Sequence, residues 1–275
     1  MHLYGQLVSG SEQVQAVQCF ERKEKIMPGF VYEKEYEIHY YEIDYNRRAL
    51  ITSLVDFFGD IATAQSEQLG VGIEYLKENN LAWVLYKWNI DVIKYPVHGE
   101  KIIVKTCPYS MKKFYAYRTF EVLNKEGQTI AKAESIWFLI NLERRRPGRI
   151  SEDVYKFYGL DYNDQNTLEI EDIKKPDKID AEKIFNVRYS DIDTNQHVNN
   201  VKYIAWAIET VPMEVVLNYT LKNLKVTYEK ETTYGETIKV VTEIITNDNN
   251  VTCLHKIVDK EEKELTLIKT TWEKN

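Results

Sequence analysis

Cysteines are scarce in this 275-residue chain, and the three present, Cys19, Cys107 and Cys253, are widely spaced without a CxxC pair. This scarcity excludes a disulfide-rich scaffold and gives no cysteine pattern for a metal cluster. It fits a reducing cytoplasm, in which isolated cysteines serve as small buried apolar residues. We therefore expect a cytoplasmic protein without a bound metal or cofactor.

The chain also lacks long apolar runs and an excess of basic residues. No stretch reaches the roughly 18–20 apolar residues that a membrane helix needs, and residues 1–27 resemble neither a signal peptide nor a transit peptide. Lys and Arg number 36 against 43 Asp and Glu, a formal net charge of −7. Nucleic-acid binding is therefore not expected, nor is a membrane span, and residues 1–30 are interpreted as a leader of uncertain order.

The most informative segment is 189–201, which reads Tyr-Ser-Asp-Ile-Asp-Thr-Asn-Gln-His-Val-Asn-Asn-Val. It follows an alternating, strand-like stretch and precedes an apolar helical stripe. Asp193, Asn195 and His197 are therefore predicted on a loop between two rigid elements, where catalytic groups are often found. Turn formation and helix capping are the alternative use of Asp and Asn in loops.

This segment has a second copy earlier in the chain. Residues 40–46 read Tyr-Tyr-Glu-Ile-Asp-Tyr-Asn and match residues 189–195 at an offset of 149 positions (193 − 44), but Arg48 stands where His197 is expected. Farther on, residues 88–100 resemble residues 224–236. We interpret the chain as a duplicated domain that has one active site, in the second half.

The expected elements are the same in both halves. In the first, a strand and loop at 31–46 precede helices at 51–69 and 73–79 and strands near 81–95, 100–110, 113–124 and 129–141. The helix at 51–69 is expected to be capped by Thr52 or Ser53, with an inner face of Leu54, Val55, Phe58, Ile61, Ala62 and Gln65. In the second, a strand near 183–190 and a helix near 199–211 precede strands near 219–231, 236–246, 250–259 and 263–273. Consecutive strands without intervening helices favour an α+β fold with antiparallel sheets over a parallel sheet. We expect two helix-wrapped sheets that merge into one continuous sheet, which removes exposed edges.

The domain boundaries are predicted from the same pattern. The first domain spans 31–150, the interdomain connection 151–182 and the second domain 183–275. Residues 150–180 read as a connection because they are polar, hold Pro176 and show no period. A basic run that includes Arg144 and Arg145 starts this connection, and it is either a docking patch for an acidic partner or a solvated face.

The chain resembles the acyl-acyl-carrier-protein thioesterases. The similarity rests on Asp193-Thr-Asn-Gln-His-Val-Asn-Asn-Val-Lys-Tyr-Ile, on Trp83-Val-Leu-Tyr-Lys-Trp-Asn-Ile and on Ala133-Glu-Ser-Ile-Trp137 with the basic run after it. It spans about residues 31–273 and implies a double hotdog fold. Without a plastid-type leader, the chain is more similar to bacterial members.

The resemblance also implies functional residues. The catalytic positions of the family fall on Asp193, Asn195, His197 and Glu231. Thr232 stands where plastid members carry a cysteine, which favours activated water over a cysteine nucleophile. We assign Glu231 as general base or water-positioning group, Asp193 as a second carboxylate, and His197 as the proton carrier.

Further assignments concern binding. Thr232, Asn199, Trp83, Arg144 and Arg145 are substrate-binding candidates, although Asn199 and Asn200 fit better as caps of the helix that follows. Backbone N–H groups near 198–200 are expected to form the oxyanion site. The acyl pocket is expected in the first half, against the helix at 51–69.

The resemblance implies a carrier protein as partner. This carrier presents the acyl chain on 4'-phosphopantetheine, and a homodimer is left open. An acyl-coenzyme A thioesterase, a hotdog hydratase and a non-catalytic acyl-thioester binding module are the competing hypotheses. The first shares the chemistry and differs in the docking surface.

Overall fold

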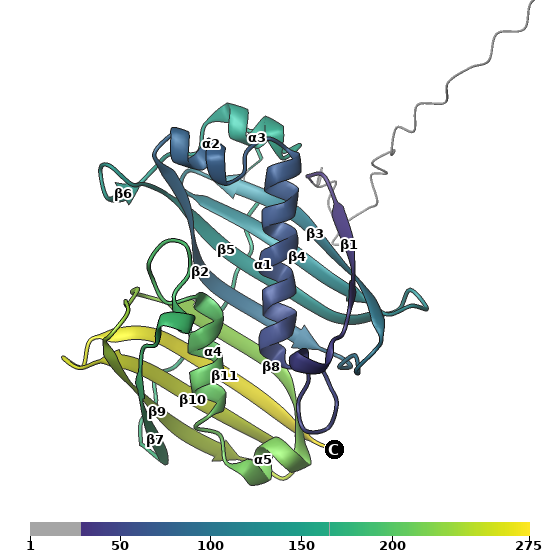
Figure 1. The fold of residues 1–275 in the computed structure, drawn as a ribbon, viewed down its shortest axis with the longest axis vertical. Helices are drawn as coiled ribbons and strands as arrows, with labels where there is room; N and C mark the ends of the chain where they lie inside the picture. The colour runs from purple at the N-terminus through teal and green to yellow at the C-terminus, as the bar shows by residue number, and fades with distance from the viewer. Residues whose placement is uncertain (1–28, 165) are drawn as a thin grey trace, which may run out of the picture.

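The structure is a computed structural model that describes residues 29–164 and 166–275 (Figure 1). The leader expected at 1–30 lies outside the described residues except for Gly29 and Phe30, and Cys19 lies outside them as well.

Each half consists of one strand, a helical segment and a run of antiparallel strands. The first half contains β1 (Tyr32–Glu37), α1 (Ile51–Gln68), α2 (Ile73–Glu78), β2 (Leu81–Val92), β3 (Lys101–Lys112), β4 (Tyr115–Leu123), β5 (Thr129–Asn141), β6 (Arg146–Pro147) and α3 (Glu152–Phe157). The second contains β7 (Ala181–Asn186), α4 (Asn200–Ile208), α5 (Met213–Asn218), β8 (Tyr219–Tyr228), β9 (Thr237–Thr246), β10 (Asn250–Asp259) and β11 (Glu264–Lys274). Short 3-10 helices at Tyr40–Glu42 and Tyr189–Asp191 follow β1 and β7.

All the strands belong to one antiparallel sheet, as the sequence predicts. Its order is β1-β3-β4-β5-β2-β8-β11-β10-β9-β7, and β6 pairs with β5 outside this path. The two halves meet where β2 pairs with β8, with Trp88 opposite Val226. Each half therefore covers one edge of the other, and the junction leaves no exposed edge at the centre of the sheet.

Helices α1 and α4 lie on the same face of this sheet (Figure 1). The predicted inner face of α1 is confirmed, since Leu54, Phe58 and Ile61 have no exposed surface. Beneath α1, the ring of Trp88 lies 5.8 Å from that of Phe58 and 5.2 Å from that of Phe120, measured between centroids. One continuous core therefore runs under both helices.

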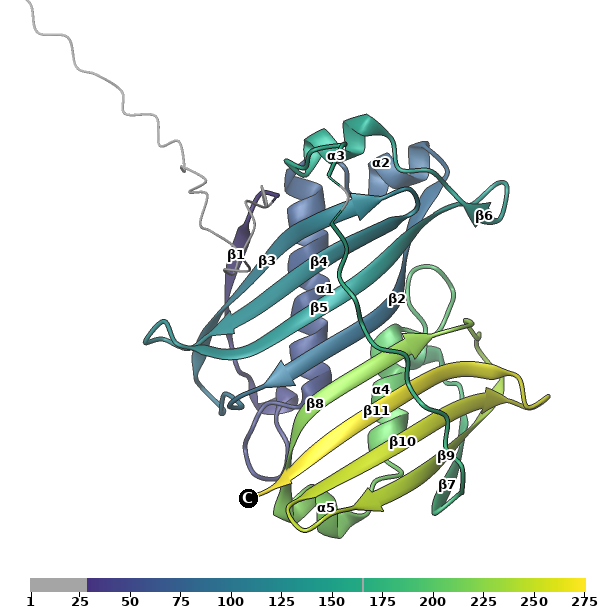
Figure 2. The same ribbon diagram turned by 180° about the vertical axis from the view of Figure 1, so that it is seen from behind.

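The segment between the halves crosses the opposite face of the sheet (Figure 2). Lys87 of β2 lies 2.6 Å from Asp172, and Lys225 of β8 lies 2.6 Å from Glu171, as measured between Nζ and carboxylate oxygen. Strands from both halves thus hold the segment on this face, next to their junction.

Two local predictions are wrong. Leu50 is the residue before α1, and neither Thr52 nor Ser53 caps the helix; the Ser53 hydroxyl donates instead to the carbonyl of Glu42. The stretch 150–180 contains a helix, α3, where the sequence shows no period. Helix α3 forms because Val154 and Tyr155 are buried against the first half.

Candidate active site

The loop of residues 192–198, called the second-half loop, is closed by its own backbone. Ile192 and Val198 form a β-bridge, and the Asp193 N–H donates to the carbonyl of His197 at 2.8 Å. The Asp193 carboxylate accepts the N–H groups of Asn195 at 2.8 Å and His197 at 3.4 Å. Asp193 therefore holds the loop in shape, the turn-forming use that the sequence left open.

His197 and Glu231 face each other across this loop. Nε2 of His197 lies 3.2 Å from Oε1 of Glu231, and the two side chains are 36% and 65% exposed. Glu231 comes three residues after the end of β8, so a strand end and a loop bring the two groups together. Their exposure leaves both accessible to a substrate from solution.

Thr232 joins the second-half loop to the strand end. Its carbonyl accepts the N–H of Val198 at 2.9 Å, and its side chain is buried. The described cysteines are buried at other places, Cys107 in β3 and Cys253 in β10. Burial raises the pKa of the Cys253 thiol to about 11, so this thiol is protonated and unreactive at neutral pH.

The backbone N–H groups at the start of α4 are largely occupied. Asn199 caps the helix, and its side-chain oxygen accepts the N–H of Val201 at 3.0 Å, as the sequence predicts. The N–H groups of Val198 and Asn199 donate to the carbonyls of Thr232 and Asp191. An oxyanion site is expected from the N–H groups near 198–200, and for residues 198 and 199 this expectation is wrong because both groups are already bonded within the protein.

The remaining candidates lie on several elements of both halves. Asn195 is exposed in the loop. Trp83 is half-buried in β2 and packs against the small core that includes Leu139 and Val154. Arg144 and Arg145 are exposed in the turn between β5 and β6. The structure thus brings His197 and Glu231 into contact and ties Asn195 and Thr232 to the same loop. Trp83, Arg144 and Arg145 belong to the first half.

The loop of residues 43–49, called the first-half loop, has the same backbone arrangement. Ile43 and Ala49 form the matching bridge, and Asp44 accepts the N–H of Arg48 at 2.9 Å. Ala49 donates to the carbonyl of Pro96 at 2.8 Å, as Val198 does to Thr232. Pro96 therefore corresponds to Thr232, and Tyr95 to Glu231.

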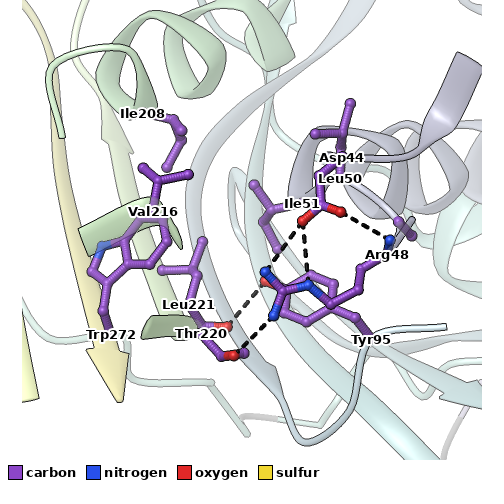
Figure 3. Close-up of a pocket in the computed structure, with 11 residues that line it drawn as sticks. Asp44, Arg48, Leu50, Ile51, Tyr95, Ile208, Val216, Thr220, Leu221 and Trp272 are labelled. Carbon is purple, nitrogen blue, oxygen red and sulfur yellow. Dashed lines mark hydrogen bonds and ion pairs between the residues drawn. The ribbon is translucent and has the colours of Figure 1, made fainter. Parts of the chain in front are cut away.

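The first-half loop contacts the second half at a small pocket (Figure 3). The guanidinium of Arg48 lies 3.2 Å from the Asp44 carboxylate and donates to the Thr220 hydroxyl at 3.0 Å. The Tyr95 hydroxyl donates to the carbonyl of Leu221 at 3.0 Å. These residues surround a cavity of about 90 Å³, so the position equivalent to His197 carries a contact between the halves.

Asp191 precedes the second-half loop and has no exposed side-chain surface. Burial alone would raise the pKa of Asp191, but hydrogen bonds from the side chain and backbone of Arg188 lower it overall. A carboxyl whose pKa is lower in the folded state stabilises the protein above its unfolded pKa of about 3.9. That contribution is lost as the pH falls through the lower, folded value.

We expect the free energy of unfolding to depend less on pH in Asp191→Asn than in the parent under acidic conditions. Urea unfolding at pH values from about 5 down to 2 measures it, because the contribution is lost between the unfolded pKa of about 3.9 and the lower folded value. Asp248→Asn, at an exposed turn position, is the matched control. If the unfolding free energy of Asp191→Asn falls with pH as steeply as that of the parent, Asp191 does not make this contribution.

The comparisons with known proteins identify the family. The acyl-ACP thioesterase N-terminal domain family matches residues 29–158, and its C-terminal domain family matches residues 174–274. The chain belongs to the acyl-ACP thioesterase family.

Curated relatives of this thioesterase family include two plant proteins. The palmitoyl-acyl carrier protein thioesterase of Arabidopsis thaliana is 27% identical over 90% of the chain and 65% of its own length. An acyl-[acyl-carrier-protein] hydrolase of Cuphea viscosissima is 30% identical over 79% of the chain. The chain spans 56% of the length of that hydrolase.

Solved structures of bacterial proteins agree in fold. A structure described as an oleoyl thioesterase from Lactobacillus plantarum has a TM-score of 0.81 and 27% identity, covering 90% of this chain and 97% of its own. An acyl-ACP thioesterase from Bacteroides thetaiotaomicron has a TM-score of 0.78 at 24% identity, over 88% of this chain and 98% of its own. The expected double hotdog fold is therefore confirmed.

The described residues contain neither a helix that could span a membrane nor a cluster that could hold a metal ion. No helix among residues 29–164 and 166–275 has the length and apolar character that a membrane crossing requires. Across the same residues, no cluster of three His, Cys, Asp or Glu side chains could hold a metal ion.

Proposed function

We propose that this member of the family hydrolyses the thioester of a fatty acyl-acyl carrier protein, releasing a free fatty acid and the carrier thiol. The observation that carries the proposal is the contact of 3.2 Å between His197 and Glu231. Both residues fall on catalytic positions implied by the family resemblance. In the first half, Arg48 and Tyr95 stand at the two corresponding positions.

The chemistry needs a base, a proton carrier and a leaving group that receives a proton. Glu231 positions a water molecule and takes its proton while the oxygen attacks the thioester carbonyl carbon. The proton passes from Glu231 to His197 across their 3.2 Å contact, and His197 delivers it to the sulfur as the carbon–sulfur bond breaks. His197 suits this role because imidazole both accepts and donates protons near neutral pH.

The other polar side chains have supporting roles. Asp193 keeps the second-half loop closed through the N–H groups of Asn195 and His197. The Asn195 side chain is exposed beside them and is proposed to hold the thioester carbonyl or the water. Thr232 is buried with its carbonyl bound to Val198, an arrangement that supports water rather than Thr232 as the nucleophile.

The binding surfaces are proposed from where the candidate residues lie relative to the ends of the strands. Strand β5 ends opposite the start of β2, and β8 also runs towards the start of β2. Arg144 and Glu231 each lie three residues beyond those strand ends, so both lie towards the same end of the sheet. Arg144 and Arg145 are proposed to attract an acidic carrier protein there, while the acyl chain enters the first half beside α1. The reducing cytoplasm is the proposed location, on the cysteine spacing.

Release of free thiol from a panel of acyl-carrier-protein thioesters tests this function. Comparing kcat/KM for one acyl group on carrier protein and on coenzyme A separates the carrier-specific enzyme from a coenzyme A thioesterase. Tight acyl binding without thiol release would support a binding module. Loss of enoyl absorbance without thiol release would support a hydratase.

A further inference from the structure

Tyr203 is a buried residue in α4 whose hydroxyl reaches the peptide next to Glu231. Its side chain is 2% exposed, and its Oη accepts the N–H of Thr232 at 3.2 Å. That N–H belongs to the peptide bond between Glu231 and Thr232. The ring of Tyr203 packs edge-on against Trp206 and Tyr228, with centroids 5.5 and 5.9 Å away. The phenol is therefore held in place by the core.

The first half lacks this hydrogen bond although it keeps the surrounding backbone. Position 203 corresponds to Leu54 at the offset of 149, and Thr232 corresponds to Pro96. Leucine has no hydroxyl, and proline has no N–H to donate. Nevertheless Ala49 bonds to Pro96 as Val198 bonds to Thr232. The fold therefore forms without the tyrosine–amide bond, which occurs only in the half that carries His197 and Glu231.

The Glu231 side chain needs such an anchor because it is 65% exposed. An exposed glutamate after a strand end has many rotamers, and fixing it in one costs side-chain entropy. The backbone at residue 231 is held on one side by β8. On the other side it is held by the bonds of Thr232 to Tyr203 and Val198.

We propose that Tyr203 is a positioning residue for the hydrolysis proposed above, on which this inference rests. Its hydroxyl fixes the peptide that follows Glu231 and keeps the carboxylate within hydrogen-bonding distance of His197. It acts through Glu231 and does not touch the substrate.

The protonation state of Tyr203 agrees with this role. Burial raises the pKa of the phenol, and the carboxylates of Glu231 and Asp193 raise it further against the opposing effect of the Thr232 N–H. The hydroxyl is therefore neutral at physiological pH, so it is not a base. As a neutral group it accepts the Thr232 N–H and keeps its own proton.

Tyr203→Phe tests the inference against Tyr95→Phe. Both changes remove a tyrosine hydroxyl that bonds to a backbone group beside one of the two loops. We expect Tyr203→Phe to lower kcat by about 10–100-fold with KM nearly unchanged, because a displacement of about 1 Å costs up to about 10²-fold. Tyr95→Phe should keep the parent kcat. Hydrogen exchange of the Thr232 amide should accelerate in Tyr203→Phe alone.

Thr232→Pro completes a double-mutant cycle. It introduces the residue that the first half carries at this position and removes the N–H that Tyr203 accepts. If Tyr203 acts through this amide, Tyr203→Phe lowers kcat little further in the Thr232→Pro background. If the kcat losses of the two single variants add in the double variant, the inference about Tyr203 is wrong. It is also wrong if Tyr203→Phe keeps the kcat of an active parent. Neither result affects the proposed function. A parent that releases no thiol overturns the proposed function and this inference together.

Discussion

Glu231→Gln lowers kcat for thiol release by about 10²–10⁴-fold, the usual contribution of a positioned acid or base. The amide has the shape of the carboxylate but cannot take a proton from water. KM should change little because Glu231 acts on the reacting water and not on the acyl chain. Steady-state thiol release from one acyl-carrier-protein thioester measures both constants.

Glu229→Gln is the matched control for this experiment. Glu229 is an exposed glutamate two residues earlier, just beyond the end of β8. The same loss of one negative charge there should leave kcat at the parent value. Equal losses in both variants would indicate a general electrostatic effect. A parent-like kcat in Glu231→Gln would remove Glu231 from the mechanism.

Trp88→Ala destabilises the protein by about 3–5 kcal/mol, the usual cost of removing a large buried aromatic side chain. Trp88 is 1% exposed and lies between Phe58 of α1 and Phe120 of β4. It also belongs to β2 where this strand pairs with β8. The loss is a large part of a typical unfolding free energy of about 5–15 kcal/mol. Guanidinium unfolding with a constant m value measures it.

Trp88→Phe separates packing from hydrogen bonding at the same position. The Trp88 indole N–H is buried without an acceptor among the described residues. Phenylalanine therefore loses ring volume but no hydrogen bond, and its cost should be clearly smaller than that of alanine. A parent-like midpoint for Trp88→Ala would show that the helix and sheet close up around the gap.

The order of helices and strands could be predicted because the spacing of apolar residues, every second residue in strands and every three to four in helices, is a local signal. The strands and the apolar face of α1 follow from such patterns. Helix α3 could not, because it has six residues in a polar stretch and forms by packing Val154 and Tyr155 on the first half. Boundaries also depend on tertiary bonds: β7 ends at Asn186, and a 3-10 turn at Tyr189–Asp191 takes the place of its expected last residues.

The candidate site was partly predictable. The repeat singled out His197, and the family resemblance supplied Glu231. The occupied N–H groups of Val198 and Asn199 were not predictable, since their acceptors, Thr232 and Asp191, depend on tertiary contacts. Tyr203 was missed because an aromatic residue within an apolar helix resembles ordinary core. The repeat held one signal for it: Leu54 and Pro96 stand at the positions of Tyr203 and Thr232, so the first half cannot form this hydrogen bond.

The fusion of two halves in one chain lets each loop change by itself. In a symmetric dimer of identical subunits, any substitution appears in both copies of a site. Here the two loops differ at one corresponding position, where the first-half loop has Arg48 and the second-half loop has His197. Arg48 and Tyr95 now bond to Thr220 and Leu221 of the other half. In a duplicated chain the contact between the halves and the proposed chemistry therefore belong to different loops. Substitutions in the first-half loop can change that contact without altering the residues proposed to react.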